Sequence, residues 1–154
     1  MPVSLRPLLA QRPGRSIFSE DGQFLDCEPG AWFPVELAEN ALAEARQALY
    51  EHDRWLAPAK PERIAARVAT LLAHYWVGQM PASLQTAVAS DWIEDLREFP
   101  AHVIDEAARK WRRMETRRPT PAAVRDLCQR IVATHRRHRD QLRQLVEFNL
   151  RESA

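Results

Sequence analysis

The chain has 154 residues, of which 45% are hydrophobic and 28% charged, and its formal net charge is +1. This length and composition are typical of one globular domain with flanking segments. No apolar run approaches the roughly 20 residues of a membrane span, and the N-terminus lacks a hydrophobic stretch of signal-peptide type, so we expect a cytoplasmic protein without membrane association. Cys27 and Cys128 have no CxxC or Cys/His companion, so we expect no disulfide framework, no metal and no cofactor.

The charges are sorted along the chain. Residues 1–108 carry 9 Lys and Arg against 16 Asp and Glu, a net charge of −7. Residues 109–143 carry 12 Lys and Arg against 3 Asp and Glu, a net charge of +9. An arginine-dense block in a near-neutral protein indicates a partner that is a polyanion or an acidic protein surface.

The first 33 residues differ in composition from the rest. They contain four prolines and three of the four glycines, and no helical periodicity is visible. We predict an irregular N-terminal arm over residues 1–33, with a short extended piece at 16–25.

Downstream of this arm the pattern is helical. Apolar residues recur at i, i+4 and i+7, and prolines and a glycine separate the segments. We predict helices at 34–54, from 61 to just before Gly78, at 82–98, and from 100 to just before Arg117. Leu84 and Met114 are placed on the inward stripes. The second to fourth helices are expected to pack through Leu72, Val88, Trp92, Leu96, Val103, Ala107 and Trp111.

A last helix begins at Thr120-Pro121, an N-cap followed by proline at the first helical position. No proline or glycine follows Pro121, which predicts a helix of about 30 residues, or roughly 45 Å. The fold class is therefore predicted to be all-α. A bundle of about four helices covers residues 34–132, and residues 133–154 extend the last helix beyond it.

The last helix also carries a seam with spacings of four and three, as in a coiled coil. The seam is imperfect because some of its positions are polar. Because this helix is longer than the bundle, we expect self-association or partner docking through its distal half. The residues assigned to that contact are Leu142, Leu145 and Val146.

The arginine block is the main candidate binding site. Cations near a helix C-terminus are stabilising by about 0.3–1 kcal/mol each, so part of the block is explained by capping. The block contains more bases than capping needs and few interleaved acids. Arginine suits phosphate and carboxylate alike, so nucleic acid and an acidic protein remain equal alternatives. The assigned residues are Arg109, Lys110, Arg112, Arg113, Arg117, Arg118, Arg136, Arg137 and Arg139.

Other candidates have simpler structural explanations. His135 and His138 lie three residues apart, but arginines surround them and no third ligand is visible, so we expect polar seam positions rather than a metal site. The acids Asp91, Glu94 and Asp95, with Glu98, are expected to form a solvated face. No Walker, HExxH or GxSxG motif is present, so we expect no enzyme. Of the five tryptophans, Trp92 and Trp111 are expected in the core, whereas Trp76, which follows Tyr75, is a candidate for exposure.

Residues 64–131 resemble the small phage and prophage loaders of the replicative helicase, the loader-and-inhibitor type. An aromatic helix, DWIEDLREFPAHVIDEAARKW, precedes a proline turn, RRPTPAAVRDLC. The resemblance implies a small all-α bundle and a C-terminal segment that binds the replicative helicase. The matching positions are Trp92, Leu96, Pro100, Val103, Ala107, Trp111, Pro119, Pro121 and Val124.

Two functions therefore stay open. One is a non-enzymatic adaptor that binds a replication protein such as the replicative helicase, with or without DNA contact through the arginines. The alternative is a helical DNA-binding transcriptional regulator that acts as a dimer and places its basic residues on phosphates.

Overall fold

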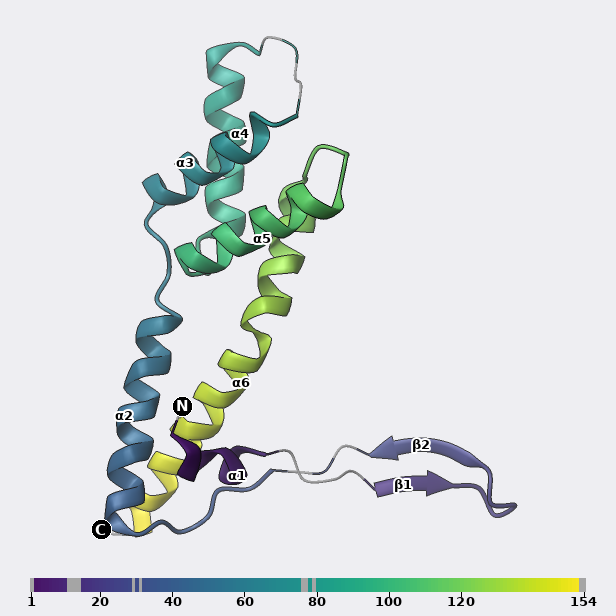
Figure 1. Cartoon of the computed structure of the whole chain (residues 1–154), viewed down its shortest axis with the longest axis vertical. Coiled ribbons are helices and arrows are strands. Elements are labelled where there is room, and N and C mark those ends of the chain that lie inside the picture. Colours follow the sequence, from purple (N-terminus) through teal and green to yellow (C-terminus); the bar gives the residue numbers. More distant parts are fainter. Residues whose placement is uncertain are drawn as a thin grey trace. The chain divides into compact units, whose positions relative to one another are not determined.

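The computed structural model describes residues 2–10, 15–28, 30, 32–75, 78 and 80–152. It has an all-α fold, as predicted, with one short β-hairpin near the N-terminus (Figure 1). None of the helices in the described ranges combines the length and apolarity needed to cross a membrane. The chain divides into two compact units. Unit 1 contains residues 1–52 and 137–154, and unit 2 contains residues 53–136.

The helices lie close to their expected positions. They are α2 (Glu39–Trp55), α3 (Pro61–Leu72), α4 (Ala82–Leu96), α5 (Ala101–Met114) and α6 (Pro121–Glu152). Pro61 occupies the first turn of α3, as expected. Pro100 was expected in the first turn of the fourth helix and instead directly precedes α5, as Pro81 precedes α4. The Thr120 hydroxyl accepts a hydrogen bond from the Ala123 N–H at 3.3 Å, which confirms Thr120 as the N-cap of α6.

The segment interpreted as an irregular arm contains regular structure. A 3₁₀ turn, Val3–Leu5, leads into the short helix α1, Arg6–Leu9. Strands β1 (Arg15–Phe18) and β2 (Phe24–Glu28) then pair antiparallel, with a register shift between Ile17 and Phe18. Gly22 supplies the positive φ of 77° in the connecting turn, a conformation that favours glycine.

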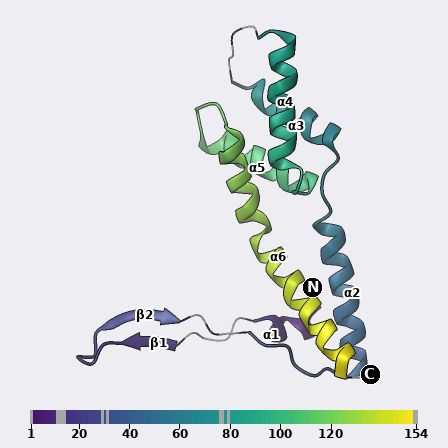
Figure 2. The same ribbon diagram turned by 180° about the vertical axis from the view of Figure 1, so that it is seen from behind.

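Unit 2 is a helical bundle around one apolar core. Figures 1 and 2 show α3, α4, α5 and the first part of α6 gathered together, seen from opposite sides. Trp92 and Trp111 are buried, as predicted, and so are Leu96, Val103 and Ala107. Leu72 and Val88 are partly buried and pack against this core. Two inward assignments were wrong: Leu84 is 48% exposed, and Met114, the last residue of α5, is 74% exposed because the apolar stripe continues past the packed core.

Unit 1 has a second apolar core. It is formed by the N-terminal helical turns, the first part of α2 and the last part of α6. Leu142 and Leu145 are fully buried there and Val146 is 8% exposed. These residues pack against Leu5, Leu9, Ala45 and Ala48. The expectation that Leu142, Leu145 and Val146 form a free partner or oligomer face was therefore wrong, because this chain's own N-terminal segments cover them.

The first long helix starts at Glu39 rather than Pro34 because a polar seam residue of α6 holds the preceding segment. The Asn149 side chain accepts a hydrogen bond from the Leu37 N–H at 2.7 Å and donates one to the Val35 carbonyl at 2.9 Å. Its amide nitrogen also donates to the Leu145 carbonyl at 2.8 Å. Backbone groups that a helix would have satisfied internally are thus paired with a side chain, and the buried Asn149 amide is satisfied as well.

Candidate binding site at the end of α5 and the adjoining groove

The exposed bases of α5 lie on one side of its C-terminal part. Arg109, Arg112 and Arg113 have the spacing i, i+3, i+4, which places them on one helix face, and all three are exposed. Arg112 and Arg113 belong to the last turn, where positive charge complements the helix dipole. Capping explains why arginines are tolerated here. Capping depends only on positive charge near the helix end, so it does not require these guanidinium groups to form ion pairs within the chain.

The two acids of α5, Asp105 and Glu106, are already paired with other bases. Asp105 forms ion pairs with Arg63 at 2.9 Å and Arg67 at 3.0 Å, both from α3. Glu106 pairs with Lys110 at 2.9 Å. Within the described chain, Arg109, Arg112 and Arg113 consequently have no carboxylate partner. Arg112 instead approaches Nε2 of His74 at 3.4 Å.

The turn after α5 is fixed by aromatic side chains. The Trp111 indole N–H donates a hydrogen bond to the Arg117 carbonyl at 3.1 Å, and the Arg117 guanidinium lies 5.6 Å from the centroid of the same ring. The Tyr75 hydroxyl donates to the Glu115 carbonyl at 3.2 Å. These bonds hold residues 115–117 against the bundle, so the arginines of this turn start from an ordered backbone.

Arg136, an assigned base of α6, is held inside unit 2 together with the neighbouring Arg125. Arg125 and Arg136 both bind Glu98 at 2.9 Å. Burial alone would raise the pKa of Glu98, but hydrogen bonds and charge from these two arginines outweigh it and lower that pKa. The Arg136 guanidinium also lies 5.2 Å from the Phe99 ring. Glu98 is exposed, as expected for a solvated acidic face, and it also links the turn after α4 to α6.

The remaining assigned bases divide into those that form an ion pair and those that do not. Arg117 binds Glu115 at 3.3 Å and Arg139 binds Asp140 at 2.7 Å. Arg118 and Arg137 are exposed and make no ion pair with any residue that the structure describes. The sequence block therefore separates into internal ion pairs and a smaller set of available guanidinium groups. Arg109, Arg112, Arg113 and Arg118, hereafter the α5-end arginines, form the available set in unit 2.

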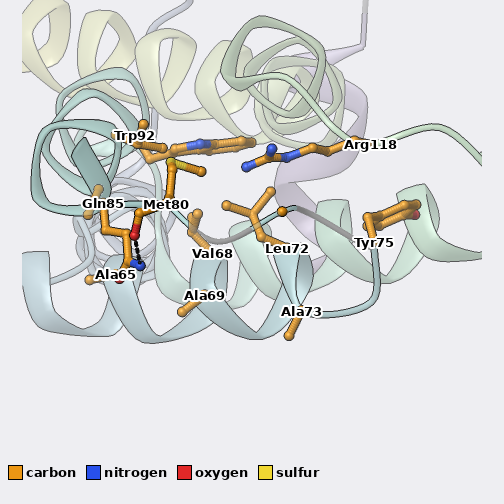
Figure 3. Close-up of a pocket in the computed structure, with 13 residues that line it drawn as sticks. Ala65, Val68, Ala69, Leu72, Ala73, Tyr75, Met80, Gln85, Trp92 and Arg118 are labelled. Carbon is orange, nitrogen blue, oxygen red and sulfur yellow. Dashed lines mark hydrogen bonds between the residues drawn. The ribbon is translucent and has the colours of Figure 1, made fainter. Parts of the chain in front are cut away.

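An apolar groove lies between α3 and α4 of unit 2, with a volume of about 750 Å³ (Figure 3). One wall comes from Ala65, Ala69 and Ala73, and from their neighbours Val68 and Leu72. The other wall comes from Val88 and Trp92 of α4, with Met80 before that helix. Arg118 is the charged residue of the described lining, and in Figure 3 its side chain extends in the direction of the Trp92 indole. The groove could not be predicted from the sequence, because its wall residues have the same spacing as core residues.

Histidine and cysteine side chains have packing roles here. His135 stacks on Trp55 with 3.8 Å between ring centroids, and Trp55 also contacts His102 at 4.4 Å. His138 meets His52 edge-on at 6.2 Å. Among the described residues no group of three or more His, Cys, Asp or Glu is arranged to hold a metal ion. Burial, with a smaller effect of Glu98, raises the pKa of the Cys128 thiol to about 12, which makes it a poor nucleophile.

Two tryptophans remain, Trp32 and Trp76. The Trp32 indole donates to the Leu8 carbonyl at 2.7 Å within unit 1, so its N–H is satisfied. Trp76, the candidate for exposure, lies outside the described residues.

Comparison with known proteins gives no match to a protein-family model, a curated protein or a solved structure.

Proposed function

We propose that this protein is a non-enzymatic, cytoplasmic adaptor that binds an acidic surface of another protein through the α5-end arginines. The observation that carries the proposal is the state of Asp105 and Glu106. Both carboxylates already form ion pairs, Asp105 with Arg63 and Arg67 and Glu106 with Lys110. The adjoining exposed arginines therefore have no carboxylate partner within the described chain. Guanidinium groups of this kind are well suited to bidentate pairing with carboxylates of a partner.

The groove favours a protein over a nucleic acid as that partner. Interfaces with nucleic acid are polar and strongly positive, and a phosphate backbone offers no apolar side chain for a groove of this size. Protein interfaces combine an apolar pocket with arginine and aromatic residues at their energetic centre. Arg118 belongs both to the α5-end arginines and to the groove lining, and Trp92 forms part of one wall.

The alternative of a DNA-reading helix receives less support from α6. Its apolar face, which includes Val124, Cys128 and Val132, is buried in unit 2, and Arg125 and Arg136 are held by Glu98. Charge that phosphates would need is thus neutralised within the chain. The resemblance to phage helicase loaders names one concrete partner, and we include the replicative helicase in the proposal on that ground.

The test compares a double charge reversal, Arg109→Glu with Arg113→Glu, with a control reversal at Lys60. Lys60 is exposed and precedes α3, where a carboxylate is tolerated by the helix dipole. Binding to purified replicative helicase is measured by biolayer interferometry, and binding to a fluorescein-labelled duplex is measured by anisotropy over a salt series.

We expect the double reversal to weaken helicase binding at least about tenfold, which corresponds to about 1.4 kcal/mol, with no change for Lys60→Glu. We expect duplex binding to stay weak throughout. Tight duplex binding, with a salt slope that falls by about 0.9 for each reversed contact, would instead assign the arginines to phosphate. Absence of helicase binding by the unmodified protein would reject the helicase as partner.

A further inference from the structure

The α3–α4 groove has the size of a binding site and an unusual lining. Its volume of about 750 Å³ lies within the roughly 300–1,000 Å³ common for binding pockets. Ala65 and Ala69 of α3 and Ala73, the C-cap residue of that helix, recur every four residues, so they form one row, and their side chains end at Cβ. The row covers nine residues, with a rise of roughly 12 Å from first to last, so one wall of the groove has about that length.

The polar groups around the groove differ in whether they are satisfied. The Gln85 side-chain amide donates to the Met80 carbonyl at 2.8 Å, as the dashed line in Figure 3 shows. The Tyr75 hydroxyl donates to the Glu115 carbonyl. Arg118 has neither an ion pair nor a hydrogen bond to any residue in the described ranges. The groove therefore offers apolar walls beside one available positive charge.

We propose that this groove binds a segment of the partner protein in which a bulky apolar side chain lies next to an Asp or Glu. The apolar side chain fills the space over the alanine row, and the carboxylate pairs with Arg118. This inference rests on the proposed function, since Arg118 joins the groove to the α5-end arginines. That continuity favours a protein segment over a free small acid.

The probe is a library of random peptides displayed on phage and selected against the full chain. The matched pair of variants is Ala69→Trp and Ala66→Trp. Both positions are exposed on α3, but only Ala69 lines the groove, so only the first variant obstructs it. Circular dichroism and thermal unfolding establish that each variant is folded. Gln85→Trp, which obstructs the groove from α4, replaces Ala69→Trp if that variant does not fold.

We expect enriched peptides to share a large apolar residue with Asp or Glu within a few positions. Their synthetic versions should lose at least about tenfold in affinity for Ala69→Trp and keep full affinity for Ala66→Trp. Arg118→Glu should weaken them similarly, and exchanging the peptide's acid for lysine should restore binding to Arg118→Glu. Restoration by charge exchange identifies a direct pair, which a general loss of structure would not produce.

Several outcomes would overturn the inference. They are the absence of enriched peptides, enrichment of peptides without an acid, and equal affinity for the two tryptophan variants. A further arm titrates decanoate and decanol while the Trp92 indole N–H signal is followed by NMR. Micromolar binding of decanoate without peptide binding would assign the groove to a small acid and reject a protein segment.

The two proposals fail in different ways. If Arg109→Glu with Arg113→Glu abolishes helicase binding while no peptide occupies the groove, the adaptor function stands and the groove inference fails. If peptides occupy the groove but the reversal leaves helicase binding unchanged, the α5-end arginines are not the adaptor surface.

Discussion

The indole ring of Trp55 and the imidazole ring of His135 stack nearly parallel, with 3.8 Å between centroids and 17° between ring planes. Both residues belong to unit 2, where His102 approaches the edge of the same indole. Burial, and next the charge of His102, lowers the pKa of His135 below its usual value of 6.5. The stacked imidazole is therefore favoured in its neutral form, and protonation opposes the folded state.

This stack predicts a pH dependence of stability. Well above pH 6.5, the usual pKa of histidine, His135 is neutral in both the folded and the unfolded state and does not contribute to the pH dependence. As the pH falls below that value, the unfolded chain takes up the proton more readily than the folded chain, so the free energy of unfolding decreases until the lowered folded pKa is passed. We expect the stability of His135→Phe to fall less than that of the unmodified protein between about pH 7 and pH 5. Urea denaturation at both pH values measures the difference.

His74→Phe serves as the control for the His135 experiment, because His74 is exposed near Arg112 and makes no stack with Trp55. This control should lose stability with falling pH as the unmodified protein does. An equal loss for His135→Phe and the unmodified protein would remove His135 as the source.

The two buried tryptophans of unit 2 should dominate its stability. Trp92 and Trp111 are 3% and 5% exposed, so replacing either by Ala should lower the free energy of unfolding by about 3–5 kcal/mol. Met114→Ala, at a position that is 74% exposed, is the matched control and should change it by less than about 0.5 kcal/mol. A large effect at Met114 with small effects at both tryptophans, seen in thermal unfolding, would reverse the assignment of core and surface.

Helix positions were predictable because local signals specify them. Prolines 61, 81, 100 and 121 set the starts of helices, and apolar spacing set the inward faces of α3 and α5. The start of α2 was not predictable, because it depends on Asn149, which is more than a hundred residues away in sequence. A polar seam residue gives no indication of which backbone groups it will bind.

The candidate site was predictable in composition and not in detail. Sequence placed Arg113 and Arg136 in one basic block, but it could not show that Arg136 is held by Glu98, which lies in the turn after α4. Nor could it show that Leu145 is covered by the N-terminal segment, because that segment's apolar residues, Leu5 and Leu9, lie among prolines in a stretch too short to indicate what they pack against. Pairing between distant segments decides both points.

Cys128 should be unreactive while unit 2 is folded. Its thiol is fully buried and its pKa is raised to about 12, so very little thiolate forms near neutral pH. The measurement uses Cys27→Ser, which leaves Cys128 as the remaining cysteine, and follows its reaction with Ellman's reagent. We expect labelling to be at least about a hundredfold slower in buffer than in denaturant. Comparable rates in the two solutions would show that the thiol is accessible in the folded chain.

The last prediction concerns unit 1, where α6 was expected to bind a partner and instead forms core. Asn149→Leu keeps side-chain volume but leaves the Leu37 N–H and the Val35 carbonyl without their partner, so it should destabilise by about 1–3 kcal/mol. Leu145→Ala should cost about 2–5 kcal/mol because Leu145 is fully buried. Leu150→Ala, at a 46% exposed position of the same helix, is the control.

Chemical denaturation and light scattering, applied to all three variants, distinguish the two roles of the helix. Loss of stability at an unchanged mass supports a core role, whereas loss of an oligomer at unchanged stability would restore the partner face.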